Sequence, residues 1–128
     1  MTIVLDADVV IGALDASDDH HASARDHFSK WRSDGIPRAL SVVNLTEVLI
    51  APATEPARLH AAREAISALG ITIHAPNEAI AVDAARLRGS HPISLPDAYA
   101  LATARHTGGR IVSFDRRLMR AAKAEGLD

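Results

Sequence analysis

The chain has 128 residues, which is enough for one domain with a buried core, and its 48% hydrophobic and 23% charged residues are typical of a globular protein. The absence of cysteine excludes a disulfide framework, a thiolate zinc site and a cysteine nucleophile. The formal net charge of −2 argues against a protein that holds nucleic acid by bulk charge, although it leaves room for a local basic rim.

Short apolar runs predict four strands, and helix-capping residues with glycine or proline terminators predict the helices between them. The predicted strands cover residues 2–5, 36–40, 71–74 and 110–114. The predicted helices cover residues 9–14, 19–32, 42–50, 55–69, 78–88, 97–106 and 116–124. We expect Asp18 or Asp19 to cap the second helix and Gly89 to end the fifth. The apolar run over residues 9–14 is too short to span a bilayer and no basic segment precedes it, so we expect a cytoplasmic protein without membrane association.

Strands that alternate with helices indicate an α/β fold with a parallel sheet covered on both faces. Such sheets bind ligands outside the carboxyl ends of their strands. Asp6 follows the first predicted strand and Asp115 follows the last. The functional site is therefore expected at the edge where these two acids lie.

Two further acids join them by the same argument, because the first turns of the helices meet along that edge. Glu47 belongs to the third predicted helix and Asp97 opens the sixth. Carboxylates that share one cleft repel each other unless a cation joins them, and neither lysine of the chain lies near any of the four in sequence. Ligation by oxygen alone favours a hard divalent cation, Mg²⁺ or Mn²⁺.

Each acid also has a plain structural explanation. Asp6 suits a turn or a helix cap, Asp97 suits the first turn of a helix, and Asp115 suits an N-cap. Glu47 is an ordinary residue for an exposed helix face, although its apolar neighbours predict a largely buried helix. Taken together, these explanations require four independent coincidences.

Four segments in this order resemble the PIN-domain ribonucleases, specifically the VapC-type toxins of toxin–antitoxin pairs. The matching segments are IVLDADVV at residues 3–10, SVVNLTEVL at 41–49, LPDAYALATA at 95–104 and IVSFD at 111–115. The resemblance covers essentially the whole chain. It implies a single PIN-like domain over residues 1–128, folded as a three-layer α/β/α sandwich with a short central parallel sheet.

The resemblance also implies roles for individual residues. The acidic metal site is expected to hold Mg²⁺ (or Mn²⁺), and its members are Asp6, Glu47, Asp97 and Asp115. Ser113 stands where the family has Thr or Ser and is expected to support the metal ligands by a hydrogen bond. Asp8 stands where the family usually has Asn or Ser, so it is either an additional acid beside the ligands or a turn residue. Arg116 stands where some members carry a further acid, which leaves a core of four carboxylates.

The implied function is a metal-dependent endoribonuclease that acts as the toxin of a type II toxin–antitoxin pair. The family implies a homodimer and a cognate antitoxin whose C-terminal segment blocks the cleft. Three arginines after the last strand are the candidates for contacts with RNA phosphates, and a solvated basic face is the alternative: Arg116, Arg117 and Arg120.

Three other functions remain open from the sequence. In a phosphatase of the haloacid dehalogenase type, Asp6 would form the aspartyl-phosphate and Asp8 would be the acid or base, but neither Lys30 nor Lys123 is well placed to hold the phosphoryl group. A receiver domain needs an acceptor aspartate after its third strand, where this chain has His74. A non-catalytic metal-binding module would use the same four acids.

Overall fold

Four short parallel strands form the centre of the molecule, in the order β3-β2-β1-β4. The computed structural model describes all of residues 1–128. The strands are β1 (Ile3–Leu5), β2 (Arg38–Ser41), β3 (Ile71–His74) and β4 (Arg110–Val112). The helices are α1 (Ala7–Leu14), α2 (His21–Ser33), α3 (Val42–Leu49), α4 (Pro56–Ala68), α5 (Glu78–Ser90), α6 (Leu95–His106) and α7 (Arg116–Ala124). A single 3₁₀ turn over Pro52–Thr54, which the sequence did not predict, links α3 to α4.

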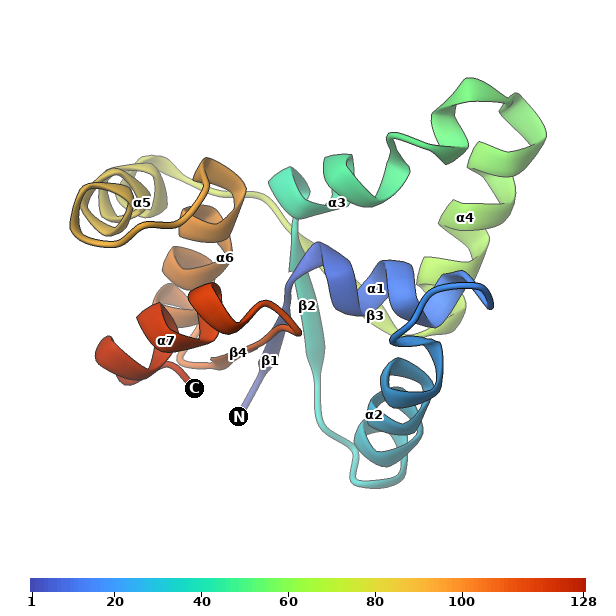
Figure 1. Cartoon of the computed structure of the whole chain (residues 1–128), viewed down its shortest axis with the longest axis horizontal. Helices are drawn as coiled ribbons and strands as arrows, with labels where there is room; N and C mark the ends of the chain where they lie inside the picture. Colours follow the sequence, from blue (N-terminus) through green and yellow to red (C-terminus); the bar gives the residue numbers. More distant parts are fainter.

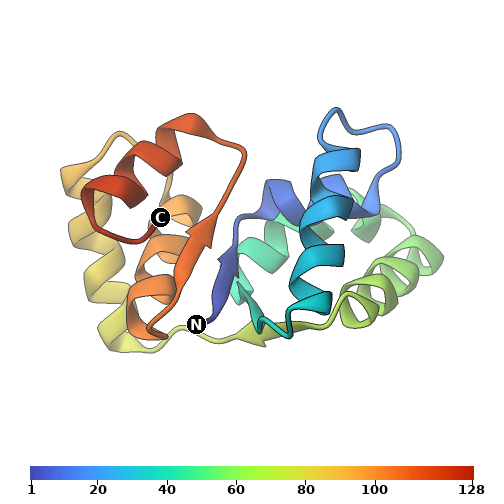
Figure 2. The ribbon, with the colours of Figure 1, turned by 90° about the horizontal axis from the view of Figure 1, so that it is seen from below.

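Side chains of the central strands alternate between the two faces of the sheet and enter two separate cores. Val4 and Ile111 pack against α5, α6 and α7, whereas Ile3, Leu5 and Leu40 pack against α1–α4. Figures 1 and 2 show these two groups of helices on opposite sides of the strands. The predicted three-layer α/β/α sandwich with a parallel sheet is therefore confirmed. None of the helices combines the length and apolar character needed to cross a bilayer.

The middle position of β1 determines where the site lies. β1 pairs with β2 on one side and with β4 on the other, both in parallel register. The carboxyl ends of these three strands consequently meet at one edge of the sheet. Asp6 comes directly after β1, and its backbone N–H donates to the carbonyl of Val112 at the end of β4. The first residues after β1 and β4 are thereby joined where the two strands end.

Several predicted boundaries differ from the observed ones. The second helix begins at His21, and Asp18 instead accepts from the backbone N–H of His20 in the preceding turn. Gly89 lies inside α5, which continues to Ser90. The last strand ends at Val112 because the next residues turn away to hydrogen-bond with acidic side chains of the site.

Two glycines test how closely the backbone is packed. A Cβ at Gly109 would lie 2.3 Å from the carbonyl oxygen of Thr2, an oxygen that accepts the backbone N–H of Arg110 where β4 begins. A Cβ at Gly89 would meet nothing within 4 Å on the outside of α5.

We expect Gly109→Ala to lower the free energy of unfolding by about 2 kcal/mol or more, because the backbone must move to make room for the added Cβ. Gly89→Ala should raise it by about 0.5–1 kcal/mol, because alanine is the better helix former. Urea unfolding of the two variants measures both changes, and equal effects would contradict this account of the packing.

Candidate active site

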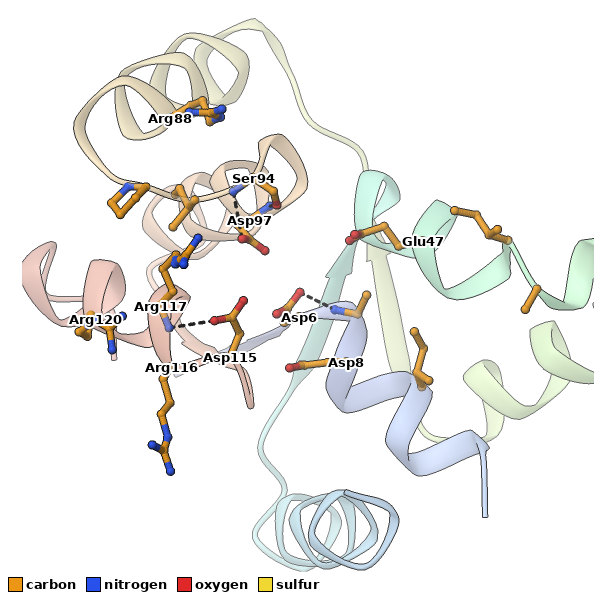
Figure 3. A pocket seen from close by; sticks show the side chains of 16 residues that line it. Asp6, Asp8, Glu47, Arg88, Ser94, Asp97, Asp115, Arg116, Arg117 and Arg120 are labelled. Atoms are coloured by element: carbon orange, nitrogen blue, oxygen red, sulfur yellow. Dashed lines mark hydrogen bonds between the residues drawn. The ribbon is translucent and has the colours of Figure 1, made fainter. Parts of the chain in front are cut away.

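An open cleft of about 1330 Å³ lies at the carboxyl ends of the central strands. Five acidic side chains line it: Asp6, Asp8, Glu47, Asp97 and Asp115. They come from α1, α3, α6 and α7 or the residues just before these helices. Figure 3 shows the carboxyl groups of Asp6, Glu47, Asp97 and Asp115 pointing toward a shared space. The fold thus brings together the four acids that the sequence analysis selected, and adds Asp8.

Three of these acids are held at the N-termini of helices. Asp6 caps α1 and accepts the N–H of Ala7 at 2.8 Å, while Asp115 caps α7 and accepts the N–H of Arg117 at 2.8 Å. Asp97 accepts the N–H of Ser94 at 3.1 Å in a capping box at the start of α6. The structural explanations for these acids are therefore correct, and they do not exclude function. Each cap uses one oxygen, and the second oxygen of Asp97 and of Asp115 accepts no hydrogen bond from the protein.

Glu47 enters the cleft from the opposite side, on α3. This half-buried side chain accepts a hydrogen bond from the amide of Asn44 at 3.0 Å through Oε1. Of the helix residues, only Asn44 and Val48 are buried, so α3 is less buried than its apolar sequence predicted. The hydrogen bond fixes one oxygen of Glu47 and leaves Oε2 without a protein partner.

Ser113 connects two of the acids, as predicted from the family pattern. Its hydroxyl donates to Oδ2 of Asp6 at 2.6 Å and lies 3.3 Å from Oδ2 of Asp8, while it accepts the N–H of Asp115 at 2.9 Å. A hydroxyl has one proton to donate, so it cannot satisfy both carboxylates at once. Asp8 also accepts the N–H of Phe114 at 3.0 Å, which ties it to the segment that carries Asp115.

Burial and like charges make ionised Asp6 unfavourable. The pKa of Asp6 is raised to about 7, mainly by desolvation and also by the carboxylates of Asp8 and Asp97, while hydrogen bonds from Ser113 and Ala7 oppose the rise. Desolvation also raises the pKa of Asp8, against hydrogen bonds from Phe114 and Ser113. None of the five carboxylates forms an ion pair with Arg, Lys or His. The cleft consequently holds negative charge that no side chain of the protein neutralises by contact.

Positive charge lies farther out on the same cleft. Four exposed arginines line it: Arg88, Arg116, Arg117 and Arg120. Figure 3 shows them on the side of α5 and α7, across from Glu47. The predicted Arg116, Arg117 and Arg120 are thus at the cleft. The sequence analysis did not predict Arg88. The residues around it in α5 do not indicate which face of that helix lies at the cleft.

The donor set suits a hard divalent cation by its chemistry. All candidate ligands are carboxylate oxygens, and those of Glu47, Asp97 and Asp115 include one free oxygen each. No three acidic or histidine side chains are close enough together to enclose an ion between them. A Mg²⁺ ion keeps several of its water molecules in proteins, so it would need only one or two of these carboxylates as direct ligands.

The raised pKa of Asp6 makes a prediction for stability in the absence of divalent ions. Because the pKa is near 3.8 in the unfolded chain and about 7 in the folded one, ionising Asp6 destabilises the fold above about pH 7, and this effect fades as the pH falls below it. Asp6→Asn removes the charge and keeps an acceptor for Ala7. We expect it to raise the unfolding temperature by roughly 5–10 °C at pH 8 and by much less at pH 5.

Thermal unfolding in EDTA at the two pH values measures this difference. Asp34→Asn is the control, because Asp34 is exposed and lies outside the cleft. A variant that is less stable than the parent at pH 8 would contradict the electrostatic account of Asp6.

Solved structures share this fold over nearly their whole length. VapC20 of Mycobacterium tuberculosis, a toxin described as cleaving the sarcin–ricin loop, superimposes with a TM-score of 0.75 at 18% identity and covers 94% of this chain and 95% of its own. A toxin–antitoxin complex from Klebsiella pneumoniae gives 0.72 at 23% identity, with 89% and 87% covered. VapBC2 of Rickettsia felis, bound to a DNA fragment from its promoter, gives 0.75 at 13% identity, with 94% and 93% covered.

The sequence itself has no significant match among curated proteins. The profile that describes the PIN domain matches residues 3–124, which include every strand, every helix and all five acids of the cleft. The resemblance inferred from the four sequence segments is thereby confirmed at the level of the family. The chain belongs to the PIN domain family.

Proposed function

We propose that this protein is a metal-dependent endoribonuclease and the toxin of a type II toxin–antitoxin pair. The observation that carries the proposal is the cleft in which five carboxylates lie together and none of them forms an ion pair with a basic side chain. Asp6, Glu47, Asp97 and Asp115 are the proposed residues of the Mg²⁺ (or Mn²⁺) site, where they would hold the ion directly or through its bound water, with Ser113 and Asp8 in support. A divalent ion held by these residues would acidify a water molecule and stabilise charge on the oxygens of a phosphodiester.

The comparisons support this proposal through the family and through the described activity of one neighbour. PIN-domain nucleases generally use divalent metal ions. VapC20, which shares the fold, is described as a toxin that cleaves the sarcin–ricin loop. We infer that RNA is also the substrate here.

The side chains of the cleft have separate tasks in this proposal. Asp97 and Asp115 offer free oxygens at the N-termini of α6 and α7, where backbone N–H groups fix their orientation. Asp6, at the centre, is ionised less readily, so proton and cation compete for it near neutral pH. The arginines on the α5 and α7 side hold the phosphates that flank the cleaved bond.

A homodimer and a cognate antitoxin are part of the same proposal. Structural neighbours from Klebsiella pneumoniae and Rickettsia felis were solved as complexes of a toxin with its antitoxin. A basic side chain of an antitoxin that entered the cleft would form the ion pairs that the five carboxylates lack within the chain, and would exclude the cation.

The aspartyl-phosphate phosphatase is disfavoured by the geometry. Asp6, which would be its nucleophile, is only 6% exposed and accepts hydrogen bonds on both oxygens. No lysine lines the cleft to hold a phosphoryl group. The cleavage experiment below distinguishes a nuclease from a metal-binding module that has no catalytic activity.

The purified protein should cleave single-stranded RNA in Mn²⁺ or Mg²⁺ and lose this activity in EDTA. Asp97→Asn keeps the acceptor for Ser94 and removes the charge, so it should lower the cleavage rate by about 100-fold or more while α6 stays capped. Sequencing of new RNA 5′ ends after incubation measures the cleavage and identifies the sites.

The control is Glu78→Gln, which removes the same charge from the first turn of α5, outside the cleft. It should cleave at the parent rate. Cleavage that persists in chelator, or an Asp97→Asn variant as active as the parent, would contradict the proposed metal site; a phosphatase would produce no new ends.

The arginines predict a salt-dependent contribution to RNA binding. Arg88→Gln and Arg120→Gln should each weaken binding and lower the slope of log affinity against log salt by about 0.7, the value for one phosphate contact on a single strand. Binding is measured by fluorescence anisotropy in the Asp97→Asn background, which prevents cleavage. Arg86→Gln is the matched control, because Arg86 is also an exposed arginine of α5 but does not line the cleft. If Arg86→Gln weakened RNA binding as much as Arg88→Gln, the contribution would come from the overall charge of the protein and not from contacts at the cleft.

A further inference from the structure

Asn44 is a fully buried polar residue beside the cleft, although it does not line it. Its side chain is 0% exposed on α3. The amide nitrogen donates to Oε1 of Glu47 at 3.0 Å and to the carbonyl of Pro96 at 3.2 Å. Both partners are acceptors, so the –NH₂ group must make both contacts and the orientation of the amide is determined.

The two contacts connect opposite walls of the cleft. Glu47 lies one turn along α3 from Asn44, and Pro96 precedes Asp97 in the first turn of α6. Figure 3 shows Glu47 and Asp97 approaching the shared space from these two helices. No ion pair joins α3 to α6, and the hydrogen bond from Asn44 to the carbonyl of Pro96 is the only one by which a side chain links them. The amide therefore holds Oε1 of Glu47 and the backbone at the start of α6 at the same time.

Asn44 is costly for the fold in one respect. Its Oδ1 is buried and has no hydrogen-bond partner. A buried polar atom without a partner destabilises the folded state, and an apolar side chain of similar size at this position would avoid that penalty. A residue that weakens the fold at the edge of a functional cleft is best explained by what its other atoms do there.

We propose that Asn44 is a positioning residue that sets the geometry of the cation site by holding Glu47 against the start of α6. The inference rests on the proposed function, because it assigns Glu47 to a divalent cation. With Oε1 held by the amide, Oε2 is the oxygen that Glu47 presents to the ion. Asn44 itself contacts neither cation nor RNA.

The test measures Mn²⁺ binding by isothermal titration calorimetry, in the parent and in a Glu47→Ala background. Asn44→Leu removes both hydrogen bonds and keeps the number and branching of the side-chain heavy atoms. We expect it to weaken Mn²⁺ binding by about 10-fold in the parent, the magnitude typical when a residue that orients a metal ligand is removed. In the Glu47→Ala background, the same substitution should change the affinity by less than about 2-fold, since the residue it orients is absent.

Two further variants separate positioning from general effects on α3. Val48→Ala removes packing from a buried position one turn farther along the helix and should leave Mn²⁺ affinity unchanged. Asn44→Ser is the milder variant should the leucine prevent folding, and it should weaken binding in the parent background alone.

The outcomes distinguish this inference from the proposed function. An equal loss of affinity in both backgrounds, or no loss in the parent, would overturn the positioning role while the cation site stands. A parent chain that binds no Mn²⁺, or that binds it equally well after Glu47→Ala, would overturn the assignment of Glu47 and the positioning role with it.

Discussion

The helix N-termini that meet at the carboxyl edge of the sheet are the feature on which the cleft depends. A carboxylate is favoured at such a position because free backbone N–H groups donate to it and the helix dipole is positive there. α1, α6 and α7 each begin at this edge with Asp6, Asp97 or Asp115 in the capping interaction. The hydrogen bonds that cap the N-termini of these helices therefore also concentrate negative charge in one place. Structural and functional roles are not alternatives for these acids, since capping occupies one oxygen and orients the other.

The repulsion that results is relieved only in part by the protein. The hydroxyl of Ser113 has a single proton for the neighbouring carboxylates of Asp6 and Asp8, and the arginines remain at the rim without contacting an acid. Burial then shifts Asp6 toward its neutral form, to a pKa of about 7. In the proposed function, a divalent ion at the centre of the cleft would have to displace this proton, so we expect metal affinity to rise as the pH rises through this value.

Sequence patterns predicted those parts of the molecule whose causes are local. A strand followed at once by an acid located Asp6 and Asp115, and the strand–helix alternation predicted the sheet that brings them together. Positions that depend on packing between distant helices were missed: Arg88 reaches the cleft only because α5 lies beside α6, and α3 is half-exposed despite its apolar sequence. Gly89 was taken as a terminator, although a glycine on an open helix face does not end a helix when its neighbours continue the hydrogen bonding.

Asp8 connects two segments that are far apart in the sequence. Its Oδ2 accepts the backbone N–H of Phe114 at 3.0 Å and lies 3.3 Å from the Ser113 hydroxyl. The Phe114 ring stacks on His20 at 4.3 Å between centroids, which holds the same segment against α2. Asp8 thus fastens the residues after β4 to α1. Because that segment ends at Asp115, the hydrogen bonds of Asp8 keep Asp115 facing the other acids. The charge of Asp8 contributes to the cleft mainly by raising the pKa of Asp6.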